Sequence, residues 1–207
     1  MRRALLAALL LLPLPGFGQA LPEMVAVPGA PYRIARTETS VAQWQACVAA
    51  GACKPRATRW SEPTMPMTEI TAREAEAFAA WASGRLGSRC RLPTEEQWEW
   101  AARAGTATLF PWGAAMEPGK AVCHQCDPRF VHRPAPVGTM AANPYGLFDM
   151  NGNVWEWTAD CAGTGCDRRV VKGGSWYFVA AQAGSRSRAI QPSGERSYDV
   201  GFRIVCD

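Results

Sequence analysis

The chain has 207 residues, of which 48% are hydrophobic, and its 22 Lys and Arg residues nearly balance 18 Asp and Glu. This length suggests one domain with a sizeable core. The charge of +4 is mild and unclustered, which argues against a nucleic-acid partner, because such a surface carries a basic stripe.

Residues 1–20 have the three parts of an export signal. Arg2 and Arg3 precede an apolar run over residues 4–12, and Gly18 and Ala20 supply small residues before a cleavage point. The apolar run is too short to span a bilayer as a helix. We therefore predict a signal peptide, export to a periplasmic or extracellular compartment without a membrane span, and a mature domain over residues 21–207.

Regular structure is predicted mainly in the first half of the mature chain. Residues 24–27 and 32–38 are strand-like runs on either side of a Pro-Gly turn. Three helices should each begin at a capping box, in which Ser or Thr is followed three residues later by Glu or Gln. The boxes are Ser40 with Gln43, Thr71 with Glu74, and Thr94 with Gln97. The first helix should cover residues 41–49. The second should run from its capping box to about residue 86, and the third should be short and hold Trp98 and Ala101.

Helix signals stop at residue 105. Short strands are predicted near residues 154–158, 169–172, 185–189 and 201–205, with Gly, Pro and Asn between them. The chain is therefore predicted to be an α+β domain with little regular structure. Irregular stretches of this length are usually functional or held by disulfides.

The eight cysteines are expected to be oxidised in an exported protein. The short spacings favour three local disulfides, with a fourth between the two remaining cysteines. The pairs would be Cys47–Cys53, Cys123–Cys126, Cys161–Cys166 and Cys90–Cys206. His124 and His132 lie close to one pair, so a zinc site with Cys123 and Cys126 is a less favoured alternative.

Residues 143–157 concentrate turn residues and oxygen ligands. Asp149 and Glu156 enclose amide side chains and backbone carbonyls within eight residues, a set of hard ligands that suits calcium. An EF-hand is excluded, because its sixth position requires Gly and here is Val154. Two interpretations remain open from composition: a calcium site, or an Asx-rich turn whose side chains satisfy their own backbone.

Six motifs in a fixed order resemble the sulfatase-modifying factor family, whose founding members are the formylglycine-generating enzymes. They lie at residues 91–103, 110–113, 135–138, 143–157, 172–176 and 201–203. The resemblance implies a variant of the C-type lectin fold. It also implies a calcium ion held by the side chains of Asp149 and Glu156 and by the carbonyls of Gly152 and Val154.

The same resemblance argues against a copper oxidase. Formylglycine-generating enzymes bind copper through two cysteines after the Gly-Gly-Ser motif, because soft thiolates select Cu(I). Phe178 and Ala183 stand at those positions here, and no Cys occurs between Asp167 and Val205. The related ergothioneine-pathway enzymes hold iron with three histidines, whereas this chain has two. Copper is therefore not expected, and iron or zinc is less favoured than calcium.

Two functions follow, and the sequence leaves open whether the chain is an enzyme. The first is a calcium-stabilised binding or accessory module that displays the loops after Trp176 to a protein or glycan. Its contact residues would be Trp176, Tyr177, Phe178, Arg186, Arg188 and Tyr198, since aromatic and Arg side chains are the usual anchors.

The alternative function is an oxidoreductase with a different site, such as a non-haem metal site. Arg203 should pair with a buried carboxylate, either Glu99 or Glu156.

Overall fold

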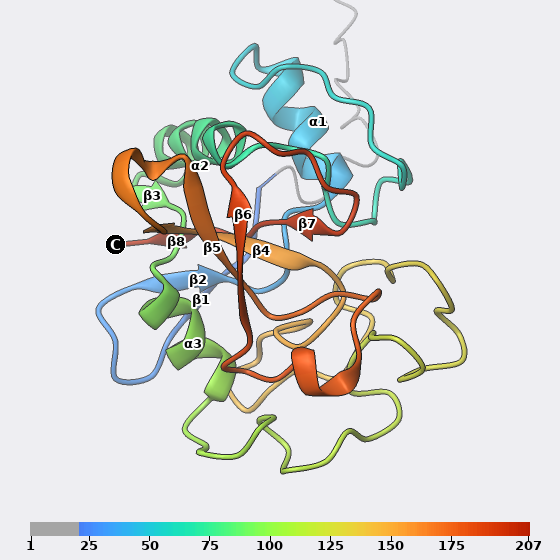
Figure 1. The fold of residues 1–207 in the computed structure, drawn as a ribbon. Coiled ribbons are helices and arrows are strands. Elements are labelled where there is room, and N and C mark those ends of the chain that lie inside the picture. The colour runs from blue at the N-terminus through green and yellow to red at the C-terminus, as the bar shows by residue number, and fades with distance from the viewer. Residues whose placement is uncertain (1–20) are drawn as a thin grey trace, which may run out of the picture.

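The computed structural model describes residues 21–207 (Figure 1). The predicted signal peptide, residues 1–20, lies outside the described residues. Within the described part, no helix has the length and apolarity needed to cross a bilayer.

The three helices begin at the capping boxes predicted from the sequence. They are α1 (Val41–Ala49), α2 (Ala72–Leu86) and α3 (Glu95–Arg103). At each start, the cap hydroxyl accepts the N–H of the third helical residue, whose side chain accepts the N–H of the cap in return. The third helix buries Trp98 and Ala101, as predicted.

The first sheet brings the two ends of the described chain together. Its order is β1 (Met24–Ala26), β2 (Arg33–Ala35), β8 (Val205–Cys206) and β3 (Cys90–Arg91), and all its pairs are antiparallel. The two-residue strand β3 was not predicted, because so short a segment has no hydrophobic period. It exists through its pairing with β8.

The second sheet has the order β6 (Arg188–Pro192), β5 (Arg168–Lys172), β4 (Trp155–Cys161) and β7 (Val200–Gly201). Only the β4–β7 pair is parallel. The strand predicted at residues 185–189 is shifted, because pairing with β5 begins at Arg188. The single strand predicted at residues 201–205 is wrong: Gly201 belongs to one sheet, Val205 belongs to the other, and buried residues 202–204 connect them.

The main core lies between the helices and β4. Figure 1 shows α1 and α2 at one end of the molecule, and irregular loops at the other. Phe78 of α2 lies between Trp44 of α1 and Phe202, with ring centroids 6.1 and 5.3 Å away. Trp155 and Trp157 of β4 are buried on one face of the strand, and Glu156 and Thr158 are buried on the other, so this strand is covered on both faces.

Residues 104–154 form no helix or strand, and two 3-10 turns, η1 (Thr164–Cys166) and η2 (Ala180–Gln182), follow later. The four predicted disulfides are present, and none of the eight cysteines is free. Because Cys123 and Cys126 are bonded to each other, they offer no thiolates to zinc.

Candidate functional site

Two Asn side chains fix the loop of residues 143–157, one within the loop and one to distant segments. The amide oxygen of Asn143 accepts the N–H groups of Tyr145 and Leu147 at 3.0 and 3.1 Å. Asn153 accepts the N–H of Ala135 and donates to Glu38, both at 2.9 Å. The turn interpretation therefore describes Asn143, whose amide oxygen satisfies nearby backbone, but not Asn153, whose partners lie 18 and 115 residues away along the chain.

Two residues of this loop, Asp149 and Glu156, form a buried carboxylate cluster with Glu38 around Arg203. The Glu156 carboxylate is fully used. Arg203 donates to its two oxygens from Nε and Nη2, each at 2.7 Å, and Trp98 donates from its indole at 2.7 Å. Both partners of the ion pair are completely buried. Of the two candidates for Arg203, Glu156 is therefore the partner, while Glu99 pairs with Lys172.

Glu38 and Asp149 differ from Glu156, because each keeps one oxygen without a hydrogen-bond partner among the described residues. These oxygens are Oε2 of Glu38 and Oδ1 of Asp149, and both are buried. Burial raises the pKa of Asp149 to about 6. Burial also raises the pKa of Glu38 well above its usual 4.5, and repulsion from Asp149 adds to the shift. Three carboxylates thus share one guanidinium, so protons or a further cation must compensate the excess charge.

These contacts test the calcium ligands that the resemblance implies. Asp149 fits, since it offers a buried, unpartnered oxygen. The Glu156 side chain does not fit, because Arg203 occupies both oxygens and its charge would repel a cation. Glu38, which no sequence motif singles out, offers the second unpartnered oxygen. Gly152 and Val154 are buried in the same loop. Within residues 21–207, no three His, Cys, Asp or Glu side chains form a ready-made metal site, so backbone carbonyls would have to complete it.

The two positions that carry copper ligands in formylglycine-generating enzymes are filled by packed hydrocarbon. Phe178 lies edge-on against Trp155, with ring centroids 5.6 Å apart. Ala183 is fully buried against Gly174, where a Cβ would lie 2.7 Å from the Ala183 Cα. Because every cysteine is in a disulfide, no thiolate is available to bind copper here.

The predicted contact residues separate into two groups. Trp176, Tyr177 and Tyr198 lie together, with the other two rings 5.5 and 5.7 Å from Trp176. Phe178 touches the edge of this group through Tyr177, at 5.8 Å. Trp176 itself is buried, whereas Tyr177 is 56% exposed. The aromatic part of the prediction therefore forms one surface.

Three residues that no motif indicated complete this surface. Trp60 lies edge-on to Trp176 at 6.2 Å, and the guanidinium groups of Arg59 and Arg133 lie 5.3 and 5.6 Å from the Trp60 ring. Trp60 and its two Arg neighbours come from irregular loops, where local sequence carries no periodic signal. We call this set the Trp176 cluster: Arg59, Trp60, Arg133, Trp176, Tyr177 and Tyr198.

A cavity of about 280 Å³ opens beside the Trp176 cluster. Its lining includes Trp176, Phe130 and two imidazoles, those of His124 and His132, whose ring centroids are 6.1 Å apart. The indole nitrogens of Trp60 and Trp176 are buried and have no hydrogen-bond partner among the described residues. The surface therefore combines aromatic faces and cations, which are groups that anchor ligands.

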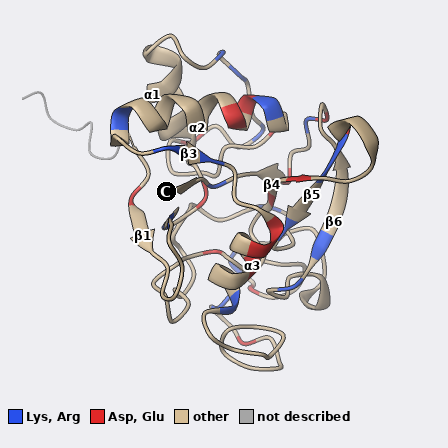
Figure 2. Ribbon diagram, turned by 90° about the vertical axis from the view of Figure 1, so that its left-hand side faces the viewer, with Lys and Arg blue, Asp and Glu red and all other residues tan. Residues whose placement is uncertain are grey.

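Arg186 and Arg188 form the second group, which lies at α3 and apart from the Trp176 cluster. Arg186, two residues before β6, pairs with Glu99 of α3 at 3.5 Å, and Arg188, the first residue of β6, pairs with Glu95 at 3.0 Å. The buried Lys172 of β5 pairs with the same two carboxylates. Figure 2 shows the acidic residues of α3 facing basic residues of β5 and β6. These charges hold a helix against a sheet.

Comparison with known proteins finds a matching family and individual relatives of this chain. A sequence profile of the sulfatase-modifying factor enzyme 1-like domain matches residues 18–207. The inactive C-alpha-formylglycine-generating enzyme 2 of Mus musculus is 37% identical over 157 residues, which are 68% of this chain and 49% of that protein. The formylglycine-generating enzyme of Mycobacterium tuberculosis is 34% identical over 178 residues, covering 69% of this chain and 57% of the enzyme. The chain thus spans about half the length of these curated relatives.

Among solved structures, PvdO from Pseudomonas aeruginosa matches with a TM-score of 0.74 at 24% identity. The match covers 85% of this chain and 80% of that one. An identity this low concerns the fold alone. The predicted α+β fold of the sulfatase-modifying factor type, held by disulfides, is confirmed.

Proposed function

Because the chain belongs to the sulfatase-modifying factor family, we propose that it is a ligand-binding or accessory module of that family. It does not carry out copper-dependent formylglycine formation. We infer the lack of this copper-dependent activity from Phe178 and Ala183, which fill the two positions where thiolates would be needed.

The Trp176 cluster is the observation that carries the binding role. Large aromatic faces and two guanidinium groups meet there beside a cavity, and Tyr177 is exposed to approaching molecules. Such rings bury a large area at a low cost in conformational entropy, and Arg adds charge and stacking. The partner would be a protein or a glycan that offers a planar or saccharide face to the rings.

Two experiments test the proposal. Glycan and peptide arrays should find ligands for the exported protein, and Tyr177→Ala or Arg133→Ala should weaken binding about tenfold or more, as expected for anchor residues. Trp100→Ala is the control, because Trp100 is 49% exposed on α3, outside the cluster. Equal losses of binding in the control and the cluster variants would contradict the site.

The second experiment tests for formylglycine formation. Incubation with copper, oxygen, reductant and a Cys-x-Pro-x-Arg peptide should give no aldehyde by mass spectrometry. Product above the no-protein control would contradict the functional assignment.

We also propose that calcium stabilises this module from the buried carboxylate cluster. Glu38 and Asp149 would supply the side-chain ligands, and the carbonyls of Gly152 and Val154 would complete the set. The unpartnered oxygens of the two carboxylates support this assignment. A divalent cation there would compensate the negative charge of the carboxylates that the single guanidinium of Arg203 does not neutralise.

A second candidate function is a metal-dependent oxidoreductase with a different site. The pair of imidazoles from His124 and His132 on one cavity wall favours it. Asp127 lines the same cavity, but Arg129 already binds its carboxylate, with the shorter contact at 2.6 Å. Elemental analysis decides between the candidates: about one iron, zinc or copper per chain, lost in His124→Ala, would support the oxidoreductase, and calcium alone would support the module.

A further inference from the structure

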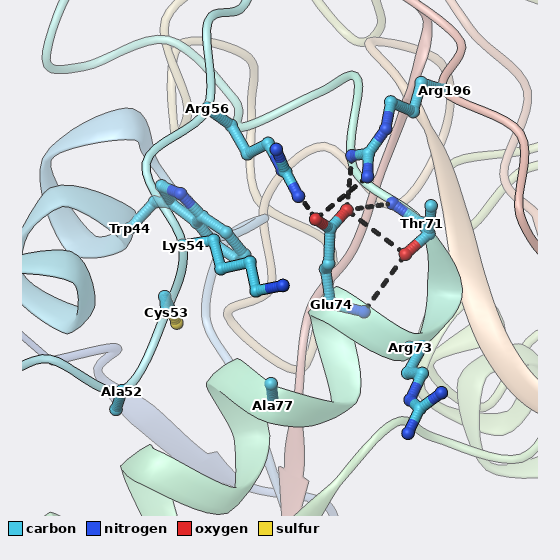
Figure 3. Close-up of a pocket in the computed structure, with 10 residues that line it drawn as sticks. All are labelled: Trp44, Ala52, Cys53, Lys54, Arg56, Thr71, Arg73, Glu74, Ala77 and Arg196. Carbon is cyan, nitrogen blue, oxygen red and sulfur yellow. Dashed lines mark hydrogen bonds and ion pairs between the residues drawn. The ribbon is translucent and has the colours of Figure 1, made fainter.

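A larger cavity, of about 530 Å³, opens between α1, the segment after Cys53 and the start of α2. We call it the Glu74 pocket, and Figure 3 shows its lining residues. They are Trp44, Ala52, Cys53, Lys54, Arg56, Thr71, Arg73, Glu74, Ala77 and Arg196. None of these residues belongs to the Trp176 cluster.

Glu74 is the one carboxylate in this lining, and its oxygens are already bound. Arg56 donates to Oε1 at 2.5 Å, and Arg196 contacts both oxygens, with Nη2 3.0 Å from Oε1. The N–H of Thr71 donates to Oε2 at 2.9 Å, as part of the capping box. Glu74 therefore fixes the two guanidinium groups at the pocket wall and neutralises only one of the charges there.

The lining carries four cationic side chains against that single carboxylate. Lys54 and Arg73 have no ion pair or hydrogen bond within residues 21–207. In Figure 3 the Lys54 amine points from the α1 side toward Glu74, whereas Arg73 extends from the start of α2. Three positive charges remain in excess around one open cavity. Like charges around one cavity repel one another and attract an anion to it.

We propose that the Glu74 pocket binds a multiply charged oxyanion, of the kind carried by sulfate and phosphate esters. Arg56 binds Glu74 through Nε, and its two Nη groups have no hydrogen-bond partner among the described residues, which leaves a pair of N–H donors suited to such oxygens. Arg196, which holds Glu74 through both of its Nη groups, adds a fixed charge, and Lys54 adds a compact one. The pocket also lies at the N-terminus of the 15-residue helix α2, whose dipole favours negative charge. Ala52 and Ala77 have short side chains, which leaves room for the rest of the ligand.

Calorimetric titration of the whole exported chain with inorganic sulfate and inorganic phosphate, at constant ionic strength, tests the proposal. Each should bind in a 1:1 ratio with a dissociation constant of roughly 1 mM or lower, and chloride should give no saturable heat. A sulfated and a phosphorylated monosaccharide then distinguish the two esters. Absence of saturable binding by either inorganic anion, or equal effects of chloride, would overturn the proposal.

Three variants locate the site. Lys54→Gln should weaken sulfate binding about fivefold, since one exposed charge has a modest effect. Glu74→Gln should strengthen binding, because Gln keeps the capping box but no longer competes for Arg56 and Arg196. Arg85→Gln, near the opposite end of α2 and outside the lining, should leave binding unchanged. Equal effects of the Lys54 and Arg85 variants, or weaker binding by a folded Glu74 variant, would show that the pocket is not the site.

Discussion

Arg203 is buried completely, and its charge depends on Glu156. Burial alone would lower the pKa of Arg203, but attraction and hydrogen bonds from Glu156 raise it above its usual value. The guanidinium also donates to the carbonyls of Ala35 and Phe148, so one side chain joins β2, the 143–157 loop and β4. Its role is to hold the elements of the fold together.

Glu156→Gln should therefore destabilise the protein strongly, with or without calcium. The substitution leaves a buried guanidinium without its counter-charge, which typically costs about 3–5 kcal/mol in the free energy of unfolding. Glu195→Gln, at an exposed position, should change it by less than about 0.5 kcal/mol. Urea unfolding measures both variants. Similar midpoints for the two would contradict the ion pair.

Glu38 should control the response to calcium. Calcium at roughly a hundred times its dissociation constant stabilises a native state by about 2.7 kcal/mol, which corresponds to a rise of about 5–10 °C in melting temperature for a domain of this size. Chelation should remove this rise from the wild-type protein. Glu38→Gln should abolish the calcium response without lowering the stability of calcium-free protein, because the variant removes a buried charge that Arg203 does not pair with. A normal calcium response in this variant would exclude Glu38 as a ligand.

At the scale of single elements, α2 owes part of its stability to the ionised Glu74. Burial would raise the pKa of Glu74, but hydrogen bonds from Arg196, the Thr71 N–H and Arg56 outweigh it and lower the pKa from 4.5 to about 2. A lowered carboxyl pKa contributes stability at pH values above about 4.5, and this contribution is lost as the pH falls toward 2. The N-terminus of α2 should therefore weaken in acid before the carboxylate is fully protonated.

Comparison with Glu74→Gln isolates this effect. The difference in unfolding free energy between wild type and variant should be constant from about pH 7 to pH 5 and should shrink between pH 4.5 and about pH 2. Urea unfolding at several pH values measures it. A difference that does not change with pH below 4.5 would show that the carboxylate charge contributes nothing to α2.

Elements with local causes were predictable, and those with distant partners were not. The capping boxes at Ser40, Thr71 and Thr94 involve residues three apart, so they fixed the helix starts correctly. Strand β3 and the division of residues 201–205 between two sheets depend on partners far along the chain. In the same way, Glu38 meets Asn153 across 115 residues, so no motif indicated its part in the carboxylate cluster.

At the scale of the whole molecule, the fold depends on a few links between distant segments. Residues 104–154 contain no helix or strand, and the first sheet has strands of only two or three residues. Short strands in such a sheet have little independent stability. The Cys90–Cys206 disulfide joins β3 to β8 in that sheet, with a sequence separation of 116 residues. It therefore constrains far more of the unfolded chain than the three local disulfides do.

Removing this bridge should cost more than removing a local one. For a loop of about 100 residues the chain-entropy estimate is about 4.7 kcal/mol, against about 2 kcal/mol for a loop as short as that closed by Cys161–Cys166. The paired variants Cys90→Ala with Cys206→Ala, and Cys161→Ala with Cys166→Ala, compare the two by urea unfolding without reductant. Wild type, unfolded but unreduced, should give no reaction with a thiol reagent, since all eight cysteines are paired. Two or more reactive thiols per chain would refute the four-disulfide scheme, and equal losses of stability in the two variants would refute the special role of Cys90–Cys206.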